Sequence, residues 1–194
     1  QILFFNMFIW SSIAHLIALT SPGPDTAVTI RQVSLYGRNA GIFTSIGIGV
    51  GIYFHCFLAI NGISLFILED DLYKFSISII GSSYIFYLGI SMLRSDSVTE
   101  YNQNNSQNSS SIYGSFFSGL ITNIFNVKAF IFFVSLFTIL IDSIQGIFFY
   151  LYPVYFSITS ALWFMLLSFL LTASKTINIH KNKLINYFLS AILC

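Results

Sequence analysis

The chain has 194 residues, of which 56% are hydrophobic and 8% are charged, and its formal net charge is +1. Soluble domains carry roughly 25% charged residues, so this composition excludes a water-soluble domain and predicts a protein that spans a lipid bilayer. The nearly neutral charge gives no reason to expect nucleic acid as a partner. The chain is long enough for about six spans of roughly 20 residues with short loops.

Cysteine and histidine residues give no sign of a redox or metal site. Cys56 and Cys194 lie far apart in the sequence and form no Cys-x-x-Cys motif, and the three histidines lack the spacing of metal ligands. We therefore expect no disulfide framework, no metal, no cofactor and no catalytic residue.

The first predicted element is an apolar span from about Ile2 to Thr20, which the segment Pro22-Gly23-Pro24 interrupts before the helix continues to about Leu35. No basic region precedes it and no cleavage pattern follows it, so we interpret it as a span and not as a signal peptide. Proline cannot donate an amide hydrogen bond, and a break in hydrocarbon persists only inside protein or beside a wet cavity. Asp25 follows the break, where the amides of a helix start favour an anion. A broken helix that carries a carboxylate predicts a binding site.

The remaining apolar segments predict five further spans, of which the last is short. They cover about residues 41–68, 72–93, 112–141, 147–173 and 184–194. The second span contains Gly47 and Gly51, whose spacing lets helix backbones approach closely within one chain or between two copies, so a homo-oligomer is left open. A polar, low-complexity run at about 96–111 is interpreted as a linker.

Basic residues follow the odd-numbered spans and predict the orientation in the membrane. Arg31 and Arg38 follow span one, Arg94 follows span three, and three lysines between positions 175 and 183 follow span five. Loops rich in lysine and arginine stay in the cytoplasm, so odd-numbered spans end inside and both termini are predicted outside.

The linker divides a single domain, residues 1–194, into two halves of three spans each, at about 1–95 and 112–194. An odd number of spans makes the second half run opposite to the first, and each half carries an interruption in its first span, at 22–25 and at 123–128. Matching breaks near the midplane are typical of inverted-repeat transporters. We therefore predict an all-α polytopic bundle of about six transmembrane helices, built from two inverted three-helix repeats.

Three motifs in the same order resemble the LysE/RhtB family of amino-acid exporters, which are homoserine, threonine and lysine efflux translocators. The segments Leu19-Thr20-Ser21-Pro22-Gly23-Pro24-Asp25 and Gly37-Arg38-Asn39-Ala40-Gly41 are similar to the family's TPGPD and G-R-x-A-G. Residues 81–94 resemble its G-A-x-Y-L-x-Y-L-G followed by L-R. Residues 119–133 resemble its G-x-x-x-N-x-x-N-P-K-A followed by F-F.

The resemblance implies a multi-pass exporter of amino acids or their derivatives in the bacterial inner membrane, driven by the proton gradient. Its partners would be a small zwitterionic substrate, protons and membrane lipid. The chain departs from the family pattern at Val127, which replaces the proline of N-P-K, and at Thr138, where the family often has proline. Without the first of these prolines, the helix through Asn126 is expected to be more continuous.

Asp25 and Lys128 are the main candidates for substrate binding. Asp25 would hold the substrate ammonium or take the coupling proton, and Lys128 would hold the carboxylate or neutralise Asp25 in the empty state. The alternatives are a structural ion pair between the two halves, and an Asp25 that only caps a helix. Charges at the membrane centre cost about 2.5–3.5 kcal/mol each, which flanking apolar residues outweigh, so insertion alone does not decide between these interpretations.

The other candidate residues are polar or shape the main chain. Asn123 and Asn126 would offer amide groups to an amino acid, or would only hydrogen-bond between helices. The predicted substrate site also includes the segment Pro22-Gly23-Pro24, which exposes backbone groups to the cavity. His15 and His55 could each relay protons, since histidine titrates near neutrality, and His15 is the second candidate for proton coupling. Such histidines are more often hydrogen-bonded packing residues.

Export of an amino acid by proton antiport with alternating access is the predicted function, and two rivals stay open. A transmembrane thiol-disulfide electron carrier has a similar helical layout, but it needs two cysteines close together, and Cys56 and Cys194 supply at most one per half. The other rival is a drifted, exporter-like protein without transport activity, which the missing proline at Val127 favours.

Overall fold

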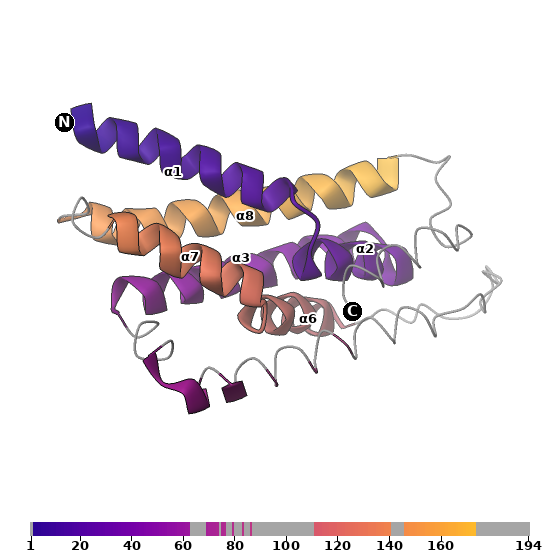
Figure 1. Ribbon diagram of the computed structural model, residues 1–194. Coiled ribbons are helices and arrows are strands. Elements are labelled where there is room, and N and C mark those ends of the chain that lie inside the picture. The colour runs from indigo at the N-terminus through magenta and orange to yellow at the C-terminus, as the bar shows by residue number, and fades with distance from the viewer. Residues whose placement is uncertain are drawn as a thin grey trace, which may run out of the picture.

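The computed structural model describes residues 2–62, 111–140 and 146–173, together with scattered positions between 69 and 86. Every regular element in these ranges is an α-helix, which confirms the predicted all-α fold (Figure 1). The helices are α1 (Ile2–Thr20), α2 (Pro24–Tyr36), α3 (Arg38–Ile60), α6 (Ile112–Ile124), α7 (Val127–Leu140) and α8 (Phe148–Ala173).

Two of these helices, α3 and α8, are each long and apolar enough to cross a membrane, as far as the described ranges go. The pair α6 and α7 passes the same test together and is bent by 58° at its break. The predicted third span, the linker and the sixth span lie wholly or largely outside the described residues. The count of six spans, the inverted repeats and the outward termini therefore stay predictions.

One helix boundary lies where it was predicted, and two others differ from the prediction. The first interruption lies where it was expected, between the end of α1 at Thr20 and the start of α2 at Pro24. The predicted polar turn at 36–39 is reduced to Gly37, whose φ of 84° is a left-handed conformation that favours glycine. The second predicted span extended to residue 68, whereas α3 ends at Ile60, just before Gly62 with a φ of 70°.

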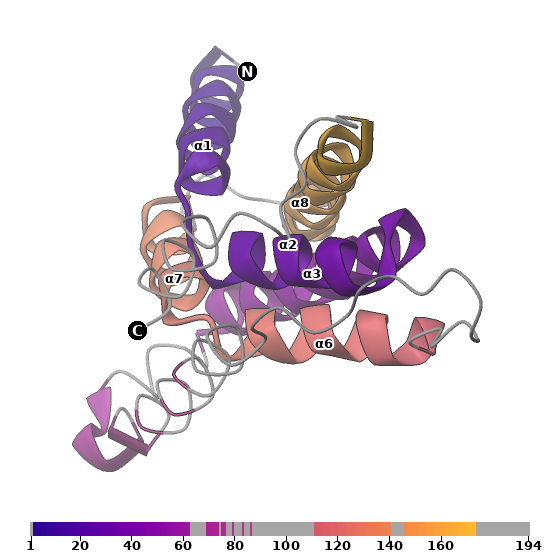
Figure 2. The same ribbon diagram turned by 90° about the vertical axis from the view of Figure 1, so that its right-hand side faces the viewer.

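Helix α3 lies at the centre of the bundle and packs against α6 and α8. In both views α1 and α8 lie on one side of α3 and α6 lies on the other (Figures 1 and 2). The backbones of α3 and α6 touch, because a Cβ at Gly47 would overlap the carbonyl oxygen of Phe116 and a Cβ at Gly119 would overlap that of Thr44. The small-residue spacing in α3 thus serves a contact inside this chain.

An aromatic cluster holds α7 against α8. Phe133 and Phe156 are almost completely buried, and their ring centroids are 5.6 Å apart in an edge-on arrangement. Phe137 packs on both rings. Such offset aromatic pairs contribute beyond their buried area. The cluster therefore anchors the middle and the C-terminal half of α7 on α8.

Candidate functional site

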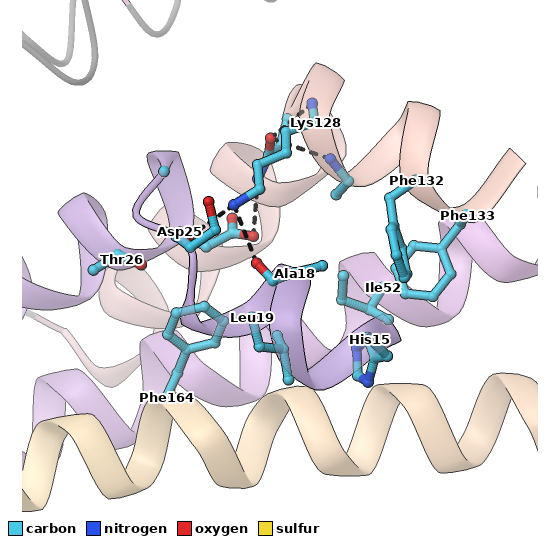
Figure 3. A pocket seen from close by; sticks show the side chains of 14 residues that line it. His15, Ala18, Leu19, Asp25, Thr26, Ile52, Lys128, Phe132, Phe133 and Phe164 are labelled. Atoms are coloured by element: carbon cyan, nitrogen blue, oxygen red, sulfur yellow. Dashed lines mark hydrogen bonds between the residues drawn. The ribbon is translucent and has the colours of Figure 1, made fainter. Parts of the chain in front are cut away.

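The two broken helices meet at their interruptions. Asp25, in the first turn of α2, accepts hydrogen bonds at Oδ2 from the Nδ2 atoms of Asn123 and Asn126, each at 2.9 Å. Asn123 is in the last turn of α6, and Asn126 lies between α6 and α7. Figure 3 shows Asp25 and the side chain of Lys128 on one side of a pocket beside this junction. The fold therefore joins candidate residues that are about a hundred positions apart in the sequence.

The carboxylate of Asp25 is buried, and its two oxygens have different surroundings. Oδ2 receives the two amide donors, whereas Oδ1 has no hydrogen-bond partner in the part of the chain that the structure describes. A buried acceptor without a partner is costly, so native proteins keep few of them without a reason. Asp25 bonds to side chains of the other half and not to amides of its own helix, so the interpretation as a helix cap is wrong.

Lys128 ties α7 to the end of α1. Its Nζ donates to the main-chain oxygens of Ala18 at 3.1 Å and Ser21 at 2.7 Å. The last carbonyls of a helix lack intrahelical partners and carry the negative end of the helix dipole, so a cation there is favourable. Asp25 and Lys128 thus line the same pocket, yet their hydrogen bonds go to different partners.

Asn126 explains why the second break exists without a proline. Its Oδ1 accepts hydrogen bonds from the main-chain amides of Lys128 at 3.1 Å and Ala129 at 3.3 Å, which is the pattern of a helix N-cap. Helix α7 therefore starts at Val127, and the chain bends by 58° at this point. The expectation of a more continuous helix through Asn126 was wrong, because asparagine supplies the stop that proline would have supplied.

Replacing Asn126 with alanine should destabilise the protein by about 0.5–2 kcal/mol, the usual cost of losing an N-cap. Val127→Pro is the matched control, because Val127 is the first residue of α7, where proline is favoured since its amide needs no helical partner. Thermal unfolding of the purified protein in detergent should show a lower Tm for Asn126→Ala and an unchanged or higher Tm for Val127→Pro. A higher Tm for Asn126→Ala than for Val127→Pro would contradict the capping role of Asn126.

Asn123 is held in place by two residues of α3, which the sequence did not connect with the predicted binding site. The Nε2 of His55 lies 2.8 Å from the main-chain oxygen of Asn123, which also accepts a hydrogen bond from the amide of Asn126 at 2.9 Å. Gly51 makes room for the amide, since a Cβ there would overlap Asn123 Oδ1. His55 therefore supports the break through a hydrogen bond. In the sequence, the small-residue spacing that includes Gly51 was the one signal that could have indicated the contact between α3 and Asn123.

His15 lines the pocket from α1, and its ring nitrogens are directed at α8. Nε2 is 3.0 Å from the hydroxyl of Ser160, and Nδ1 is 3.5 Å from that of Thr159. The ring is buried and stacks edge-on against Phe156. This is the geometry of a hydrogen-bonded packing residue, and a part in proton coupling stays a prediction.

The pocket at the junction has a volume of about 40 Å³, a few times the 10–15 Å³ that one water molecule requires. Four of the predicted binding residues line it, namely Gly23, Asp25, Asn126 and Lys128. Asn123 does not line the pocket and acts through its bond to Asp25. The two flanking prolines set the course of the chain around Gly23. Across the described residues, no group of three histidine, cysteine or acidic side chains could hold a metal ion.

The chain is similar in sequence to a family of translocators and to several bacterial membrane proteins. The chain matches the family model described as LysE type translocator over residues 16–194. It is 29% identical over 142 residues to a threonine efflux protein of Escherichia coli strain K12, which covers 72% of this chain and 69% of that protein. It is also 29% identical over 140 residues to an uncharacterized membrane protein of Haemophilus influenzae, with 68% and 64% covered.

A third relative is the uncharacterized membrane protein YrhP of Bacillus subtilis, which is 29% identical over 122 residues, with 59% of this chain and 58% of that protein covered. The match thus spans less than two thirds of the length of the Haemophilus and Bacillus proteins. No solved structure matches the chain.

Proposed function

The chain belongs to the family of LysE type translocators, and from this we propose that it exports a small amino acid or amino-acid derivative across the bacterial inner membrane. The observation that supports this most directly is that Asp25 lines the same pocket as Lys128 and has a buried Oδ1 without a hydrogen-bond partner among the described residues. An α-amino acid carries an ammonium and a carboxylate on one carbon. A pocket lined by one acid and one base fits that pair of charges.

In this proposal the substrate ammonium binds Oδ1 of Asp25, and its carboxylate binds the ammonium group of Lys128. Asn126 keeps the Asp25 carboxylate in position by its bond to Oδ2, so the free oxygen is oriented before the substrate arrives. Charge-assisted hydrogen bonds of this kind are about twice as strong as neutral ones. The substrate would thereby complete the hydrogen bonding of a buried group that lacks a partner.

Binding at Lys128 would also release α1. The same ammonium group now holds the carbonyls of Ala18 and Ser21, so a substrate carboxylate competes with the end of α1 for it. The hinge would be the short extended segment at residues 21–23, between α1 and α2. This exchange of partners would link substrate binding to the movement of a helix, as alternating access requires.

Proton antiport would follow from competition at Asp25. One carboxylate oxygen binds either a proton or an ammonium group, so protonation from the outside would expel the substrate, and loss of that proton to the inside would allow the next substrate to bind. His15 lines the same pocket and is the second proposed carrier of the coupling proton. Each cycle would exchange one zwitterion for one or more protons.

The test is export from proteoliposomes that contain the purified chain and are preloaded with a panel of radiolabelled amino acids. We expect at least one of them to leave faster when the substrate-filled compartment is the less acidic one, and to lose this advantage when a protonophore collapses the gradient. Protein-free vesicles are the control. Absence of export for the whole panel would contradict the proposal. Export gained only in Val127→Pro would favour a drifted exporter.

The thiol-disulfide carrier is tested in the same assay. Cys56 is completely buried in α3 and is a free thiol, whereas Cys194 lies outside the described residues. A buried free cysteine behaves as a small apolar residue. Cys56→Ser should therefore export at the rate of the unmodified chain, and a thiol-dependent electron transfer that this substitution abolished would support the rival instead.

A further inference from the structure

We propose that the exported amino acid has an uncharged, apolar side chain, which binds at the side of the pocket away from Asp25 and Lys128. This inference rests on the proposed function and adds the substrate class to it. The pocket has two chemically different sides (Figure 3). The first side carries the charges that an amino-acid backbone needs, and the second decides which side chain is accepted.

The second side is built from apolar groups of several helices. Figure 3 shows Phe132 and Phe133 of α7 together with Ile52 of α3 across the pocket from Asp25. Leu19 of α1 and Phe164 of α8 also line the pocket. Apolar and aromatic walls with a few polar groups at one end are the usual composition of small-molecule sites, in which the polar groups fix the orientation and the walls select the shape.

His15 is the remaining titratable group on this side, and its polar atoms are already engaged. Its nitrogens contact the hydroxyls of Ser160 and Thr159 on α8. Its ring centroid lies 5.7 Å from that of Phe133 and 6.1 Å from that of Phe132, so the imidazole is part of the aromatic wall. The ring adds flat surface to the wall, which suits an apolar side chain.

A charged side chain would find no counterion at this wall. Among the described residues that line the pocket, Asp25 and Lys128 are the charged ones, and the substrate backbone uses both. A lysine or glutamate side chain would have to leave water without a partner of opposite charge, which is strongly unfavourable. An alkyl side chain gains free energy from the same transfer. We therefore expect the protein to select substrates by the charge of their side chain more strongly than by its size.

The test uses the unmodified chain in proteoliposomes and compares amino acids of matched length. Norleucine and lysine share a straight four-carbon side chain, and lysine adds an ammonium group. We expect norleucine to be exported at least about tenfold faster than lysine and than glutamate, since a buried unpaired charge costs more than the 1.4 kcal/mol that corresponds to tenfold. Equal or faster export of lysine or glutamate would overturn this inference and leave the proposed function intact. No export of any amino acid would refute both.

A pair of variants tests the wall itself. Phe132→Ala enlarges the apolar side, so the ratio of phenylalanine to valine export should rise by about tenfold, the size of effect that small changes of volume produce in apolar pockets. Phe57→Ala is the matched control, because this phenylalanine is exposed on α3 and does not line the pocket. An unchanged ratio in an active Phe132→Ala protein would contradict the proposed position of the side chain.

Discussion

Asp25→Asn should reduce export by at least about a hundredfold while the protein remains folded in the membrane. The charge pair in question is the proposed one between the carboxylate of Asp25 and the substrate ammonium. Removing one partner of a buried charge pair costs about 3–5 kcal/mol, and each 1.4 kcal/mol is a factor of ten in rate. Asparagine keeps one oxygen that can accept the amides of Asn123 and Asn126, as Oδ2 of Asp25 does. It replaces the unpartnered oxygen by an NH₂ group, which neither attracts an ammonium group nor takes a proton. The substitution therefore removes the function assigned to Oδ1 and preserves the architecture around it.

The measurement is the initial rate of amino-acid export by equal amounts of membrane-inserted protein, with amounts determined by immunoblot and folding by size-exclusion chromatography in detergent. Glu69→Gln is the matched control, since Glu69 is an exposed acid beyond the end of α3 and should retain the full rate. A second readout is the exchange of substrate without a proton gradient. Normal export by Asp25→Asn would show that the carboxylate has only a structural role.

The first break could be predicted from the sequence because its causes are local. A glycine between two prolines stops a helix whatever surrounds it: α1 ends at Thr20, just before this segment, and α2 begins at its second proline, Pro24. The second break has a local cause too, but of a different kind. Asn126 caps α7 with its side chain, a role for which asparagine is well suited, and attention to the missing proline at Val127 led to the wrong expectation.

The partners within the site were harder to predict than its members. Opposite charges at matching breaks indicated that Asp25 and Lys128 would meet, and both line one pocket. Lys128 binds main-chain carbonyls at the end of α1 and not the carboxylate of Asp25. Every residue has a main-chain carbonyl, so the sequence does not show which carbonyls are available as partners. The same holds for the carbonyl of Asn123 that faces His55.

The apolar wall could not be predicted because the membrane helices are apolar on every side. Phe164 lines the pocket, whereas Leu166 and Leu170 of the same helix are exposed, and nothing in the local sequence separates these positions. In soluble helices the polar face identifies the buried one, but a lipid-facing surface is as apolar as a core. Only the packing of α1, α3, α7 and α8 with one another decides which phenylalanines face the pocket.

The contact between α3 and α6 leads to the second large effect, that of Gly47→Ala. One methyl group at this position would overlap the carbonyl oxygen of Phe116, and a main-chain atom can move only if α6 moves with it. Overpacking of a well-packed contact costs about 1–3 kcal/mol. Helix α6 also carries Asn123, so a displacement would weaken its bond to Asp25, and we expect both a lower Tm and a loss of export.

Gly114→Ala is the matched control for this substitution, because Gly114 is in α6 and a Cβ there would meet nothing within 4 Å. Alanine is favoured over glycine in a helix by about 0.8–1 kcal/mol, so this variant should keep or raise the Tm and export normally. Gly119→Ala should behave like Gly47→Ala, since its Cβ would overlap the carbonyl of Thr44 from the opposite side. If Gly47→Ala and Gly114→Ala had the same Tm and the same export rate, the close approach of the two backbones would not hold the site together. Loss of export with an unchanged Tm in Gly47→Ala would instead indicate that the contact positions Asn123 without stabilising the fold.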